Sequence, residues 1–91
     1  ADEAYRIGIA NQVYDDAVFP EAVAAFAARL AAAPPVTLRL IKRATYQSAR
    51  SDLRTSLDLI ASHMAVVGST ADSAEALAAF REKRPPSYIG A

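Results

Sequence analysis

An aromatic and two cationic side chains lie close together near the C-terminal end of the sequence. Phe80, Lys83 and Arg84 are three and four residues apart, so a helix would place them on one side near its end. An aromatic face beside a point charge suits a nucleotide that carries phosphates. The commoner meaning is structural, because the helix dipole favours terminal cations and phenylalanine is an ordinary core residue. On spacing alone, we favour the structural meaning.

No other set of residues singles out an active site. His63 is the only histidine, and the nearest acid, Asp58, is five residues away, so we expect a hydrogen-bonded structural residue. The adjacent Asp15 and Asp16 fit a helix start better than an acid–base pair. The sequence therefore predicts no catalytic residue and no metal site. One further row of residues, mostly basic and at helical spacing, is assigned to a solvated helix face. It consists of Arg39, Arg43, Tyr46 and Arg50.

The helix that would carry the C-terminal group is well delimited. Asp72 followed three residues later by Glu75 is a capping pattern. The tandem prolines Pro85 and Pro86 end the helix. Beyond them, residues 87–91 are expected to be extended and mobile.

Apolar spacing and helix stop signals predict that the rest of the chain is helical as well. Together with the terminal helix, this gives an all-α fold of four to five helices. Ser51 is expected to cap the longest of them. The predicted helices cover residues 2–7, about 20–32, 35–48 and 52–68, and residues 9–14 form a connector.

Five apolar residues of the longest predicted helix follow a heptad pattern, which we call the seam. One interpretation is packing against the other helices of the chain, and the other is contact with another subunit. Because the helix is too short for an independent coiled coil, we favour packing within a larger assembly. The seam consists of Leu53, Leu57, Ile60, Met64 and Val67.

The composition excludes several classes of partner. Ninety-one residues make one domain, and ten basic residues balance ten acidic ones, which argues against a general nucleic-acid partner. No apolar run is long enough to span a bilayer, so we expect no membrane partner. The absence of cysteine excludes disulfides and thiolate chemistry, and a cytoplasmic location is expected.

Four segments of the sequence, in order, carry a resemblance to a known family. They are residues 3–13 (EAYRIGIANQV), 32–35 (AAPP), 40–44 (LIKRA) and 79–90 (AFREKRPPSYIG), with Asp72 and Glu75 upstream of the last. In this order they resemble the C-terminal part of the crotonase superfamily, the enoyl-CoA hydratases and isomerases. The resemblance covers nearly the whole chain.

The resemblance implies that residues 1–91 are the C-terminal helical lobe of a crotonase-like fold. The catalytic α/β domain, with its carboxylates and oxyanion hole, would precede Ala1, so the chain is expected to be a fragment. The family acts on acyl-CoA thioesters, and hydration of a 2-enoyl-CoA is favoured. No cofactor is expected, because CoA is part of the substrate.

The resemblance also assigns a role to the C-terminal group. Phe80 and Lys83 match an aromatic and a lysine that contact the adenosine and phosphate end of CoA from a neighbouring subunit. Arg84 is left to the helix dipole and local ion pairs. The implied assembly is a homo-trimer or hexamer. Two alternatives remain, a non-catalytic helical interaction module and another family reaction, such as double-bond isomerisation or thioester hydrolysis.

Overall fold

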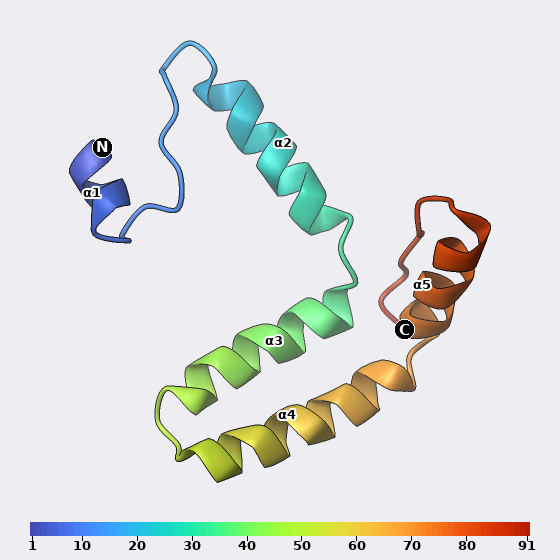
Figure 1. Ribbon diagram of the computed structural model, residues 1–91. Coiled ribbons are helices and arrows are strands. Elements are labelled where there is room, and N and C mark those ends of the chain that lie inside the picture. The colour runs from blue at the N-terminus through green and yellow to red at the C-terminus, as the bar shows by residue number, and fades with distance from the viewer. The chain divides into compact units, whose positions relative to one another are not determined.

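The computed structural model describes residues 1–91 and contains five helices and no β-strand (Figure 1). The predicted all-α fold is confirmed. The chain divides into two compact units, Ala1–Ala31 and Ala32–Ala91, which we describe separately. The helices are α1 (Asp2–Arg6), α2 (Phe19–Ala31), α3 (Pro35–Ser48), α4 (Leu53–Gly68) and α5 (Ala71–Glu82).

The first unit holds α1, α2 and the connector between them. The chain turns out of α1 at Gly8, whose φ of +80° is a conformation that glycine adopts without a steric penalty. α2 has Pro20 in its first turn, where the missing N–H leaves no helical hydrogen bond unmade. The connector over residues 9–14 forms no strand, as predicted.

In the second unit, α3 and α4 lie side by side (Figure 1). The seam of α4 is largely exposed, with Leu53, Leu57 and Met64 at 74%, 55% and 66% exposure. Packing against the other helices of the chain is wrong for Leu53 and Leu57 at the start of the seam, whereas Ile60, Met64 and Val67 line a groove that faces α3. The least exposed residues of α4 are Ser56, Leu59, His63 and Val67.

The start of α4 is fixed by Asp52. Its carboxylate accepts the backbone N–H of Thr55 at 3.1 Å and the Thr55 hydroxyl at 2.6 Å. The prediction of Ser51 as the cap is wrong, because its hydroxyl donates to the Gln47 carbonyl at 3.1 Å and lies 2.8 Å from the Ser56 hydroxyl. Ser51 thus ties the end of α3 to the start of α4.

The start of α5 also differs from the prediction. Thr70 is the cap, and its hydroxyl oxygen accepts the Ser73 N–H at 3.1 Å. The prediction that Asp72 and Glu75 cap this helix is therefore wrong. Asp72 lies in the first turn and is only 3% exposed. Both carboxylates serve the segment that follows the helix instead.

After α5 the chain turns back, and its end returns to the start of that helix (Figure 1). The Asp72 carboxylate accepts the N–H groups of Ile89 and Gly90 at 2.8 and 3.0 Å, and the Asp72 N–H donates to the Ala91 carbonyl at 3.1 Å. Gly90 has a φ of +80°, and a Cβ there would come within 3.0 Å of the Pro35 side chain. The tail is extended, as predicted, and the buried Asp72 carboxylate fixes its last turn through two N–H groups.

Few apolar side chains are shielded from solvent. Ala79 is the one buried hydrophobic residue, and no large side chain is fully buried. Much of the apolar composition is alanine, which favours helix but contributes little buried area. None of the five helices is both long and apolar enough to cross a membrane by itself.

Candidate functional site

The predicted site lies where α5 ends. The last turn closes with a Schellman motif, in which the N–H of Arg84 donates to the Ala79 carbonyl at 3.0 Å and that of Lys83 donates to the Phe80 carbonyl at 3.3 Å. Lys83 has φ 55° and ψ 38°, in the left-handed region. The helix thus ends at Glu82, before the prolines. Lys83 and Arg84 lie beyond it, so the prediction that they share a helical side with Phe80 is wrong.

Phe80 is not a core residue of this chain. Its side chain is 84% exposed, whereas the neighbouring Ala79 is 2% exposed. α5 therefore packs through the side that carries Ala79 and leaves the Phe80 ring exposed. An exposed aromatic face is available for stacking with a planar group.

Arg84 is fully engaged by carboxylates. Its Nη1 and Nη2 lie 2.5 and 2.9 Å from the two oxygens of Glu75, and its Nε lies 2.6 Å from Glu82. The Arg84 guanidinium, together with the Ser87 N–H, lowers the pKa of Glu75 to about 2. The same contacts raise the pKa of Arg84. The prediction of local ion pairs for Arg84 is confirmed, and its charge is neutralised within the chain.

Lys83 differs from Arg84 in having no internal partner. It is exposed, and no carboxylate lies within 4.0 Å of its ammonium group. The end of α5 therefore carries one exposed aromatic ring and one unpaired cation. Such a pair has the chemistry to bind a planar base and a phosphate.

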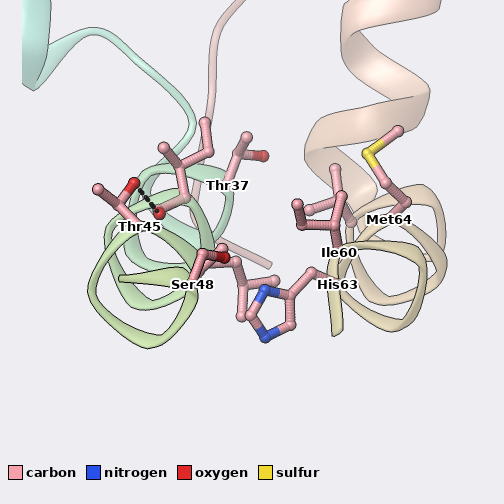
Figure 2. Close-up of a pocket in the computed structure, with 10 residues that line it drawn as sticks. Thr37, Thr45, Ser48, Ile60, His63 and Met64 are labelled. Carbon is pink, nitrogen blue, oxygen red and sulfur yellow. Dashed lines mark hydrogen bonds between the residues drawn. The ribbon is translucent and has the colours of Figure 1, made fainter. Parts of the chain in front are cut away.

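A second feature, which the sequence did not predict, is an apolar groove between α3 and α4 with a volume of about 460 Å³. Figure 2 shows His63 extending from α4 into this space, with Thr37, Thr45 and Ser48 on the α3 side. The buried Nδ1 of His63 has no hydrogen-bond partner, so the expectation of a hydrogen-bonded histidine is wrong for this atom. Three seam residues, Ile60, Met64 and Val67, form part of the α4 wall, so the heptad pattern marked that wall, but the groove itself requires both helices.

No cluster of histidine and carboxylate side chains in the structure has the geometry of a metal site. The comparison with known proteins supplies the family. Residues 1–91 match the family described as enoyl-CoA hydratase/isomerase. The chain belongs to this family. The predicted resemblance to the crotonase superfamily is confirmed.

Individual relatives agree with the enoyl-CoA hydratase/isomerase assignment. The chain is 34% identical over 90 residues to 1,2-epoxyphenylacetyl-CoA isomerase of Escherichia coli, covering 99% of the chain and 34% of the relative. It is 32% identical over 90 residues to crotonyl-CoA hydratase of Syntrophomonas wolfei, covering 98% and 34%. The crystal structure of enoyl-CoA hydratase from Bacillus anthracis matches 100% of the chain and 35% of that protein, with a TM-score of 0.93 and 33% identity.

The chain thus spans about a third of the length of the curated relatives that it matches. The matched region includes the end of α5, where Phe80 and Lys83 lie. This third consists of five helices and no strand.

Proposed function

We propose that this enoyl-CoA hydratase/isomerase-family chain is the C-terminal helical part of an enzyme that acts on acyl-CoA thioesters, by hydration of a 2-enoyl-CoA. The names of the relatives support this substrate class, since crotonyl-CoA hydratase and 1,2-epoxyphenylacetyl-CoA isomerase are both named for CoA thioesters. Double-bond isomerisation is the alternative reaction. In either reaction CoA enters with the substrate, so no separate cofactor is required.

The observation that carries the proposal is the exposed pair at the end of α5. Phe80 is 84% exposed, and Lys83 is exposed without an ion-pair partner. The adenine of CoA offers a planar face for the ring, and the phosphates of CoA offer negative charge for the ammonium group. Arg84 is excluded from this role, because Glu75 and Glu82 occupy its donors.

The chemical step is assigned to a catalytic domain outside these residues. Hydration next to a thioester needs two N–H groups that stabilise the developing enolate and carboxylates that manage the protons. Two carboxylates of the second unit already have other partners, since Glu75 binds Arg84 and Asp72 binds the returning tail. We therefore assign the chain to substrate binding and to assembly.

Binding of two thioesters by the complete enzyme tests the CoA contact. One ligand is the acyl-CoA and the other is the same acyl group on pantetheine, which lacks the nucleotide. Lys83→Ala is expected to weaken acyl-CoA binding about 10- to 150-fold, by loss of one charged hydrogen bond. Phe80→Ala is expected to weaken it roughly 5- to 100-fold, by loss of base stacking. Neither change is expected to alter the affinity for the pantetheine ester.

The matched control is Lys42→Ala, since Lys42 is the only other lysine and lies in α3. It is expected to leave both affinities unchanged. An unchanged acyl-CoA affinity in Lys83→Ala, together with a large loss of thermal stability, would contradict the binding role.

We assign the exposed seam of α4 to subunit contact, in a homo-trimer or a pair of trimers. Its support is the exposure of Leu53, Leu57 and Met64 at 55–74%, which leaves a row of large apolar side chains uncovered. Met64→Asp is expected to reduce the mass of the assembly in sedimentation measurements. Arg54→Asp, at an exposed position outside the seam, is the control. An unchanged mass in Met64→Asp would place the subunit boundary elsewhere.

A further inference from the structure

The cation assigned to CoA sits at an unusual backbone position. Lys83 occupies the left-handed residue of a Schellman motif, with φ 55°. Glycine is the usual residue there, because a Cβ makes this conformation unfavourable. The two flanking hydrogen bonds, from Lys83 to Phe80 and from Arg84 to Ala79, require the residue to remain left-handed. The direction of the Lys83 side chain therefore depends on what holds the next residues in place.

Those residues are held by Glu75. Both of its carboxylate oxygens contact the Arg84 guanidinium, at 2.5 and 2.9 Å, and Oε1 also accepts the Ser87 N–H at 2.9 Å. One carboxylate thus fixes the chain at Arg84, the residue after Lys83, and again at Ser87. The Glu75 side chain is only 24% exposed, against 61% for Glu82, the other partner of Arg84.

A second carboxylate completes this restraint at the end of the tail. Asp72, one turn before Glu75 on α5, holds Ile89 and Gly90 at 2.8 and 3.0 Å. Pro85 and Pro86 stiffen the intervening chain by fixing their φ angles. The segment after the turn is therefore anchored along one side of α5.

We propose that Glu75 is a positioning residue for Lys83: by binding Arg84 and the Ser87 N–H, it keeps the left-handed turn closed and the Lys83 ammonium in place for a CoA phosphate. The proposal rests on the proposed function of Lys83. In free solution a non-glycine residue leaves the left-handed region readily, so release of Arg84 and Ser87 allows the turn to open. Lys83 then has to be reordered upon binding, which weakens the affinity.

A double-mutant cycle in the complete enzyme tests this dependence. Glu75→Ala is expected to weaken acyl-CoA binding about 3- to 10-fold, the lower part of the range for coupled contacts. In a Lys83→Ala background, the same change is expected to alter the affinity less than about 2-fold, because there is no ammonium left to position. The affinity for the matching acyl-pantetheine is expected to stay constant in all four proteins.

The control is Glu82→Ala, which removes the other ion pair of Arg84 without releasing the tail. It is expected to change the acyl-CoA affinity less than Glu75→Ala does. Glu75→Gln, whose amide oxygen still accepts hydrogen bonds from Arg84 and Ser87, is expected to recover part of the affinity lost in Glu75→Ala.

Three other outcomes would contradict the proposal, and each identifies a different failure. An equal loss upon Glu75→Ala with and without Lys83 overturns the positioning role and leaves the CoA contact intact. An equal loss for the CoA and pantetheine esters also overturns it, since general unfolding affects both ligands. No effect of Lys83→Ala on acyl-CoA binding refutes the CoA contact itself, and the positioning role with it.

Discussion

Replacing Lys83 by glycine separates stability from binding at the end of α5. Lys83 has φ 55° and ψ 38°, where an L-residue loses about 1–2 kcal/mol relative to the right-handed helix. Glycine avoids this penalty but loses more chain entropy on folding, about 0.5–1 kcal/mol. We therefore expect Lys83→Gly to stabilise the folded state by about 0.5–1 kcal/mol. In a protein about three times the length of this chain, that corresponds to a rise in Tm of roughly 1–4 °C.

The same substitution removes the ammonium group. We expect acyl-CoA binding by Lys83→Gly to weaken about 10- to 150-fold while the Tm rises. Lys83→Ala is the comparison, because alanine loses the charge but retains the steric penalty. Its affinity is expected to match that of Lys83→Gly, with a Tm close to that of the original protein. Calorimetric melting and titration with the acyl-CoA measure both quantities.

Two results would refute this reasoning. A lower Tm for Lys83→Gly than for Lys83→Ala would mean that the left-handed conformation is not the one adopted in solution. An unchanged affinity in both variants, with the expected gain in stability, would show that Lys83 has no role in binding CoA esters.

Three further predictions concern the turns and the tail. Thr70→Ala is expected to cost about 1 kcal/mol in chemical denaturation, through loss of the α5 cap, and Thr70→Ser to restore most of it. Gly90→Ala is expected to lower the Tm more than Gly8→Ala, since both have a φ of +80° but only at Gly90 would a Cβ meet a neighbour, at 3.0 Å; equal effects would contradict the docked tail. Beside Arg84 the pKa of Glu75 is about 2, below its value in the unfolded chain. The ionised Glu75 therefore stabilises the folded state fully above about pH 4.5, and this stabilisation is lost as the pH falls toward 2. Glu75→Gln is expected to flatten this acid limb of the Tm against pH, and an unchanged limb would count against the ion pair.

Helix boundaries could be predicted where one residue decides them. Pro34 and Pro35 fix the start of α3, because proline restricts its own φ and has no N–H to donate. α4 ends at Gly68 as predicted, with Ser69 as its right-handed cap residue. Predictions failed where several polar residues compete for one role. Ser51 stands beside Asp52, and Thr70 stands close to Asp72, and each has the chemistry to cap a helix.

In both cases the residue expected to cap the helix is held by another contact. Asp72 is not free to cap α5, because it binds the returning N–H groups of Ile89 and Gly90. Ser51 is held by nearer partners, Gln47 four residues before it and Ser56 five residues after it. The partners of Asp72 lie 17 and 18 residues away, where local spacing contains no information about them.

The sequence by itself determined that the chain is helical, and it contains the family's motifs over nearly its whole length. It also brought Phe80, Lys83 and Arg84 together, since they are close along the chain. Only the tertiary structure decided their separate roles. The Phe80 ring is exposed because α5 packs through the side that carries Ala79, and Arg84 is neutralised by Glu75 and Glu82. The contacts of Arg84 with Glu75 and of the tail with Asp72 join residues 9 to 18 positions apart, a distance over which helical periodicity carries no signal.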